Sequence, residues 1–202
     1  YMNRSFDTAM QLLIGDGRVV SLSDMKQNKR ESKAFALPEQ NDSMRRLYAY
    51  LLSFRKIDKS VLNAFVQAKL IYEDKPYHNA VFVGRNENNV ARHAHKRSTN
   101  SVGKAFRINV EGSDPAYSFH WKGNSEELYV FEAPIDLLSY ISLHQDNWKD
   151  HSYVSLCGVS EQAMLKQLEL QKKILEVYLC LDNDEAGQAA TKRLTERLHS
   201  LG

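Results

Sequence analysis

The sequence predicts an α/β protein, in which a parallel sheet flanked by helices follows a smaller α+β subdomain. Between residues 124 and 202, apolar runs typical of buried strands alternate with amphipathic helical segments. Between residues 77 and 123, short apolar runs separated by glycine and proline are typical of a small antiparallel sheet. Two helical stretches with apolar stripes precede that sheet. Strand–helix alternation is therefore confined to the last part of the chain.

We divide the chain accordingly into three parts. Residues 1–42 are expected to hold a short helix near residues 6–13, followed by a polar strap or linker. Residues 43–123 combine the helical pair with the small antiparallel sheet, and residues 124–202 form the parallel sheet. The helical pair could also be a DNA-reading helix-turn-helix, although packing alone accounts for its apolar positions.

Composition narrows the class of protein. The 202 residues are 43% apolar and 26% charged with a formal net charge of +2, which is ordinary for a globular protein. No apolar run approaches the roughly 18 residues that a membrane span needs, and the first residues lack a secretory apolar region. Cys157 and Cys180 lie in apolar runs and are expected to be small core residues rather than a disulfide. We therefore expect a cytoplasmic protein without a membrane partner.

Basic side chains gather on the predicted antiparallel sheet and its loops. Between residues 85 and 107 the only acid is Glu87. Such a run usually forms a solvated surface, but it is also the pattern of a surface that binds nucleic acid or phosphate. The candidate nucleic-acid-binding residues are Arg85, Arg92, Lys96, Arg97, Lys104 and Arg107.

The strongest signal for a site is a set of carboxylates at predicted strand ends. The run ILEVYLCL leads directly into Asp182 and Asp184, and LYVF leads into Glu132. Because the carboxyl ends of parallel strands meet at one edge of a sheet, these acids should converge, with Asp136 joining from the next helix. Asp182 and Asp184 could instead be helix caps, whereas Glu132 has no capping role of its own.

Carboxylates gathered in this way favour a metal ion. Two unit charges about 4 Å apart repel by roughly 4 kcal/mol at an effective dielectric near 20, and a divalent ion removes that cost. Oxygen-only ligands suit Mg²⁺, or Mn²⁺ in its place, better than Zn²⁺. An alternative transition-metal site of His93, His95 and His120 has no cysteine or acid cluster to complete it. The metal candidates are Glu132, Asp136, Asp182 and Asp184.

The order of these features resembles the Toprim domain. An apolar strand leads to Glu132, a second to Gly158, and a third to Asp182-x-Asp184, across about residues 126–202. The last motif, LCLDNDEAGQAATKR, is highly specific. Toprim domains occur in bacterial primases, type IA and type II topoisomerases, OLD-type nucleases and recombination-repair proteins. The resemblance implies a Toprim-type parallel sheet.

Two upstream segments are similar to DnaG-type primases. The segment from Tyr50 to Arg55 resembles their Tyr-Leu and Arg motif, and GSDPAYSFHWKG resembles the stretch that leads into their Toprim domain. The likeness is closer still to uncharacterised primase-like proteins of plasmids and conjugative elements. In those proteins a region of unknown function precedes the Toprim domain, often behind a zinc ribbon. SFDTAMQLL resembles the helix after such a ribbon, so we expect a ribbon to precede this sequence.

The resemblance implies primase-like, Mg²⁺-dependent nucleotidyl transfer on single-stranded DNA in the replication of a mobile element. Glu132, Asp182 and Asp184 would be the catalytic and metal-binding acids, with Asp136 in support. The implied partners are single-stranded DNA, nucleoside triphosphates and a replicative helicase. Two alternatives stay open: a Toprim nuclease that cleaves DNA, and a catalytically inert module that binds DNA or a helicase.

The sequence departs from the primase pattern near these acids. Ala133 follows the glutamate and Asn183 separates the aspartates, where primases have glycine at both places. Asn109 also stands where a basic residue is expected, with Arg107 two positions earlier. The acids themselves are retained, so the departures bear on which reaction is catalysed rather than on the metal site.

Overall fold

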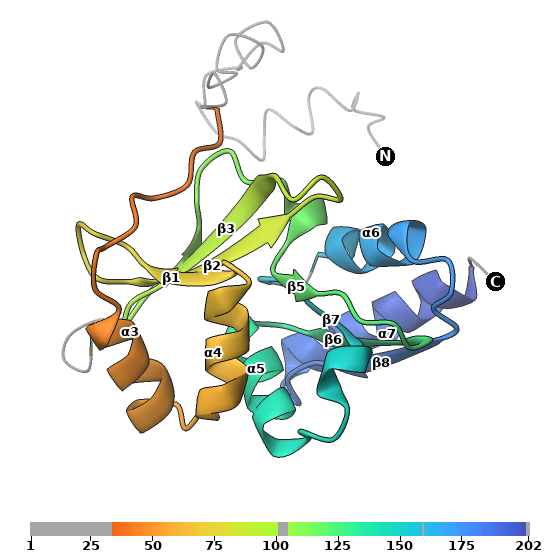
Figure 1. Cartoon of the computed structure of the whole chain (residues 1–202). Helices are drawn as coiled ribbons and strands as arrows, with labels where there is room; N and C mark the ends of the chain where they lie inside the picture. The colour runs from red at the N-terminus through yellow and green to blue at the C-terminus, as the bar shows by residue number, and fades with distance from the viewer. Residues whose placement is uncertain (1–33, 101–104, 159, 201–202) are drawn as a thin grey trace, which may run out of the picture. The chain divides into compact units, whose positions relative to one another are not determined.

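The computed structural model describes residues 34–100, 105–158 and 160–200, and the structural statements below concern these residues. The helix predicted near residues 6–13 and most of the predicted strap lie outside them, as does Lys104. The described strands form two four-stranded sheets (Figure 1), and one cluster of buried side chains includes residues of both.

The first sheet is antiparallel throughout, as predicted for this part of the chain. Its spatial order follows the sequence: β1 (Ile71–Glu73), β2 (Ala80–Arg85), β3 (Ala91–Arg97) and β4 (Arg107–Asn109). The predicted helical pair precedes it as α3 (Arg45–Tyr48), a π-helical turn (Ala49–Phe54) and α4 (Lys59–Gln67).

Helix α4 begins directly after its capping residue, Asp58. The Asp58 carboxylate accepts hydrogen bonds from the backbone N–H groups of Ser60 and Val61, at 2.7 and 3.2 Å. Leu62 and Phe65 on its inner side are fully buried. Packing against the rest of the fold therefore accounts for the apolar stripe of α4.

The second sheet contains the predicted parallel strands. Its order is β5 (His120–Trp121), β7 (Ser152–Ser155), β6 (Glu127–Phe131) and β8 (Glu176–Cys180). Strand β6 runs parallel to both β7 and β8. The helices are α5 (Pro134–Leu143), α6 (Gln162–Leu170) and α7 (Glu185–His199). Each parallel strand is thus followed by a helix, as the alternation predicts.

One strand lies in a different sheet from the one predicted. The run AYSFHW was assigned to the antiparallel sheet, but its β5 segment pairs antiparallel with β7 at the edge of the second sheet. The pairing places the Trp121 ring 5.1 Å from the ring of Phe65 and 4.9 Å from that of Trp148. Burial of these rings explains why so short a segment adds to this sheet.

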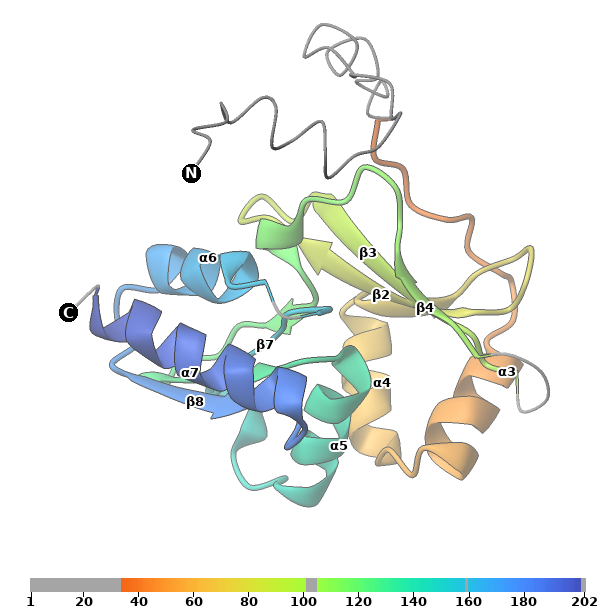
Figure 2. The same ribbon diagram turned by 180° about the vertical axis from the view of Figure 1, so that it is seen from behind.

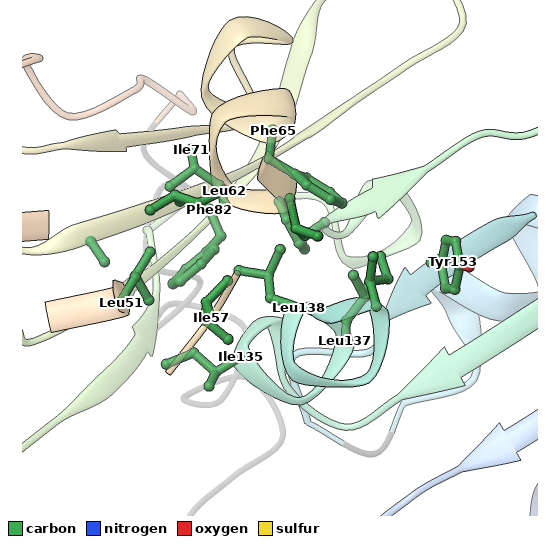
Figure 3. Close-up of a cluster of buried hydrophobic side chains, with 14 of the residues drawn as sticks. Leu51, Ile57, Leu62, Phe65, Ile71, Phe82, Ile135, Leu137, Leu138 and Tyr153 are labelled. Atoms are coloured by element: carbon green, nitrogen blue, oxygen red, sulfur yellow. The ribbon is translucent and has the colours of Figure 1, made fainter. Parts of the chain in front are cut away.

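The two parts of the fold share one core. Helices α6 and α7 cover one face of the second sheet, where Leu128, Val154 and Leu194 are buried (Figure 2). On the other face, α5 packs with α4 and the first sheet in a cluster that includes Phe65 and Leu138 (Figure 3). The predicted division near residue 123 stays a prediction, because this cluster spans it.

Both cysteines are half-buried and free, in agreement with the expectation that they form no disulfide. Neither cysteine is a fully buried core residue. Cys157 lies just past the end of β7, with a φ of 50°, and therefore in a turn rather than in a strand. No helix in the described ranges combines the length and apolarity that crossing a bilayer requires.

Candidate active site

The predicted acids come together at the carboxyl end of the second sheet. Phe131 of β6 is paired with Cys180 of β8, so the chain leaves both strands at the same edge. Glu132 follows β6 at once, and Asp182 follows β8 after one further residue. Asp136 lies in the first turn of α5, and Asp184 is the N-cap of α7. We call these four residues the acid edge.

Glu132 carries the clearest sign of charge crowding. Its side chain is only 13% exposed. Burial, followed by the neighbouring charge of Asp182, raises the pKa of Glu132, and Asp184 and Asp136 act in the same direction. Arg107 opposes them, with its Nη2 atom 3.9 Å from Glu132 Oε1. The ionised form of Glu132 is therefore under-compensated in the protein alone.

The pKa of Asp136 is raised for the same two reasons. Burial raises the pKa of Asp136, and the charge of Asp182 raises it further. The charges of Arg55 and Arg97, both from the first part of the fold, partly offset this rise. Sequence reasoning selected Arg97 and Arg107 as site residues and missed Arg55, although it quoted Arg55 in the primase-like segment.

The acid edge fits a hard divalent cation in charge and ligand type. Its donors are all carboxylates, and the raised pKa values of Glu132 and Asp136 reflect negative charge that such an ion would offset. In the part of the chain that is described, no three Asp, Glu, His or Cys side chains lie close enough together to hold a metal ion. Side-chain rotation would have to bring the carboxylates closer, so the metal assignment stays a prediction.

Asp184 is positioned by a hydrogen bond of its side chain, whereas Asp182 is positioned by the packing of its backbone. The Asp184 Oδ1 atom accepts a hydrogen bond of 2.8 Å from the backbone N–H of Gly187, so the capping alternative is correct for this residue. Its second oxygen is not used by that bond. Asp182 is exposed, and it is held through its backbone instead. A Cβ atom on Gly187 would lie 1.9 Å from the Asp182 carbonyl oxygen. Only glycine permits so close an approach.

The basic run is divided by the alternation of β3. Arg97 lies on the side of the acid edge, where its Nε donates a 2.9 Å hydrogen bond to the Tyr50 hydroxyl. Lys96, its neighbour, points to the opposite face and forms a 2.6 Å ion pair with the buried carboxylate of Asp74. Lys96 therefore stabilises the first sheet where it stands.

Two further members of the run make other contacts. Arg85 donates hydrogen bonds to two backbone carbonyls of the first part of the fold, at 2.8 and 3.2 Å. Arg92 lies 3.9 Å from the Asp114 carboxylate. The structure thus brings Arg97 and Arg107 to the acid edge and leaves Arg85, Arg92 and Lys96 engaged elsewhere.

A pocket of about 200 Å³ adjoins Glu132 between the two sheets. His95 and Asn109 contribute a hydrogen bond of 2.7 Å between the imidazole Nδ1 and the amide Oδ1. Burial lowers the pKa of His95, which favours the neutral ring as donor to Asn109. Sequence reasoning noted Asn109 only as a departure from the primase pattern. The pocket is lined by His95, Arg107, Ile108, Asn109, Glu132, Ala133, Cys157 and Gly158.

The alternative histidine site gains no support from the structure, because the described histidines form no metal-binding group. His93 is buried, and neither of its ring nitrogens has a hydrogen-bond partner within the described ranges. His120 Nδ1 instead lies 2.7 Å from the backbone carbonyl of Ser118.

Two protein-family models match parts of the chain. Residues 129–202 match the Toprim-like family model, and residues 49–125 match a model described as a protein of unknown function (DUF3991). The uncharacterized Bacillus anthracis protein pXO2-78 is 32% identical over 162 residues, which cover 72% of this chain and 45% of that protein. The chain thus spans less than half the length of this relative. The predicted Toprim domain behind a region of unknown function is confirmed.

Solved structures show the same fold. The primase fragment of the bacteriophage T7 primase-helicase is similar with a TM-score of 0.56 and 18% identity, over 83% of this chain and 69% of that one. The E. coli primase catalytic core is similar with a TM-score of 0.50 and 15% identity, over 76% and 59% of the two chains. At this identity the likeness concerns the fold alone.

Proposed function

We propose that this chain, which carries a Toprim-like domain behind a domain of unknown function, is a primase-like, Mg²⁺-dependent nucleotidyltransferase that acts on single-stranded DNA. One observation carries the proposal. Arg107 lies 3.9 Å from Glu132 of the acid edge, and the charges of Arg55 and Arg97 act on Asp136. Carboxylates suited to a divalent ion beside guanidinium groups suited to phosphates are what nucleotidyl transfer requires.

The residues divide the chemistry between them. Glu132, Asp182 and Asp184 would hold the ion, with Asp136 in support. Bound Mg²⁺ supplies charge that neutralises nucleotide phosphates and stabilises the transferred phosphorus. Mn²⁺ has the same ligand preference and should replace it.

The other groups act through the chain itself. The arginines bind and orient the triphosphate or the template backbone, since a guanidinium group matches phosphate oxygens in a bidentate way. Glu132 is also the candidate to accept the proton of an attacking hydroxyl at a carboxylate oxygen. A helicase partner and a place in mobile-element replication follow from the resemblance and stay predictions.

The test is synthesis of short RNA on single-stranded DNA. Asp182→Ala should lower the rate at least a hundredfold because it removes a carboxylate from the acid edge, whereas Glu196→Gln, an exposed acid further along α7, should not change it. Synthesis should also require Mg²⁺ or Mn²⁺. Equal synthesis by Asp182→Ala would contradict the proposal. Metal-dependent nicking of labelled DNA without nucleotides would support the nuclease alternative instead. Binding of DNA without synthesis or cleavage would support the inert module.

A further inference from the structure

An exposed aromatic side chain lies at the end of the π-helical turn, next to an arginine of the proposed site. Phe54 is 64% exposed and is the last residue of that turn. Its ring stacks on Tyr50, with ring centroids 5.7 Å apart and an angle of 20° between the planes. Tyr50 itself is buried. One face of the Phe54 ring is thus supported by the protein, while most of the side chain is open to solvent.

The supporting ring is fixed in place. The Tyr50 hydroxyl accepts the 2.9 Å hydrogen bond from Arg97 Nε. The Tyr50 carbonyl accepts a bond of the same length from the backbone N–H of Arg55, five residues later, as in a π-helix. Such wide turns are rare and occur often at functional sites. The turn therefore connects the aromatic pair to two arginines by direct contacts.

These arginines tie the aromatic pair to the acid edge. Arg97 and Arg55 both act on the carboxyl group of Asp136. Direct contacts run from the Phe54 ring through Tyr50 to Arg97, whose charge acts on Asp136. The next residue after Arg55 is the exposed Lys56, so the charge beside the open ring is positive.

We propose that Phe54 is a stacking platform for a base of single-stranded DNA, and that Arg55 and Arg97 bind the adjoining phosphates. This inference rests on the proposed function, because it places the template strand beside the acid edge. Aromatic rings stack on any base, and a phenyl ring has no hydrogen-bonding group, so the platform selects for single strands without reading their sequence. The positive charge around the ring favours nucleic acid over a basic protein segment.

Binding of fluorescently labelled oligothymidylate tests the platform. The Asp182→Ala protein serves as the parent for all variants, so that the measurement does not depend on catalysis. Phe54→Ala should weaken binding about tenfold, and Phe54→Trp should keep or improve it. Leu143→Ala, which removes an apolar side chain that is 81% exposed at the end of α5, is the matched control and should bind as the parent does.

Salt dependence separates stacking from charge. Phe54→Ala should leave the slope of log affinity against log salt unchanged, whereas Arg97→Ala should reduce it by about 0.7, the contribution of one phosphate contact in a single strand. Affinity of Phe54→Ala within twofold of the parent would overturn the inference. The proposed catalytic function would be untouched by that result, since it depends on the separate synthesis assay.

A spectroscopic signature covers the case in which Phe54→Ala disturbs the fold locally. 2-Aminopurine in the oligonucleotide should lose fluorescence when it stacks on Phe54, and the loss should be absent in Phe54→Ala at saturating protein. Phe54→Trp should restore it. Equal quenching by the parent and Phe54→Ala at saturation would overturn the inference.

Discussion

At the scale of single residues, the surroundings of a carboxylate decide its role. Glu132 follows a buried strand, and its neighbours are other acids, so its pKa is raised. Asp74 is also buried, but Lys96 Nζ lies 2.6 Å from its carboxylate oxygen. The pKa of Asp74 is therefore lowered in spite of its burial. Asp184 uses one oxygen as a helix cap. Negative charge that is only partly compensated therefore marks the acid edge, whereas fully paired acids mark structural positions.

The buried His93 gives a prediction for pH dependence. Burial lowers the pKa of His93 from 6.5 to about 4. The unfolded chain then binds more protons than the folded one between these values, so this residue contributes stability above pH 6.5 that is lost as the pH falls to 4. The loss amounts to about 3 kcal/mol when complete. His93→Leu should therefore lose less stability than the parent between pH 7 and 4.5.

Urea unfolding at the two pH values measures this difference. His144→Leu, in which an exposed histidine is replaced, is the matched control and should keep the pH dependence of the parent. Parallel pH profiles of His93→Leu and the parent would contradict the assignment of acid sensitivity to His93.

At the scale of elements, the second sheet places the site through its strand ends. Strands β6 and β8 are in parallel register, so acids fifty residues apart in sequence leave the sheet together. Helix α7 then fixes the position of Asp182 through the contact of Gly187 with its carbonyl group. Helix α7 thus positions an acid of the acid edge and also packs against the second sheet.

Gly187→Ala tests the role of α7. The added methyl group cannot occupy a position 1.9 Å from the Asp182 carbonyl oxygen, so the loop before α7 must shift. We expect a cost of about 1–3 kcal/mol in unfolding free energy and at least a tenfold loss of synthesis. Ala189→Ser, at an exposed position in the same helix, should change neither. Full activity of a destabilised Gly187→Ala protein would show that the acid tolerates the displacement.

At the scale of the whole molecule, the shared core holds guanidinium groups of one sheet against carboxylates of the other. Phe65 of α4 is fully buried, and its ring lies 5.4 Å from Phe119 and 5.7 Å from Trp148. The backbone N–H of Asp58 also donates a 2.9 Å hydrogen bond to the Ser142 hydroxyl of α5. These contacts cross from the first part of the fold to the second, so the two parts should unfold together.

Phe65→Ala should lower the free energy of unfolding by about 3–5 kcal/mol, because it removes a ring from this junction. Tryptophan fluorescence reports on the junction, since the rings of Trp121 and Trp148 both lie against Phe65. Far-UV circular dichroism reports on all helices and strands. The two signals should change at one urea concentration in the parent protein. Leu143→Ala should leave that midpoint unchanged. Separate transitions in the parent would contradict a common core.

The sequence by itself determined the α/β class, the parallel strands and the acids at their ends. These are local signals: apolar runs of strand length, helical spacing after each, and a specific motif from Leu179 to Arg193. The cap of α4 could be narrowed to Asp58 or Ser60 for the same reason, since a cap is satisfied by its own helix, and the structure selects Asp58.

Only the tertiary structure decided which charges and rings face the acid edge. Lys96 and Arg97 are adjacent in sequence, yet one pairs with a buried acid and the other faces the site, because packing selects which face of β3 points inward. The place of β5 depends on rings contributed by α4 and by the segment after α5. Phe54 is a candidate binding residue because its ring stacks on Tyr50, which accepts a hydrogen bond from Arg97. Tyr50 and Arg97 are more than forty residues apart in sequence. Local sequence patterns do not predict such contacts, because the contacts form only when the two sheets pack around a common core.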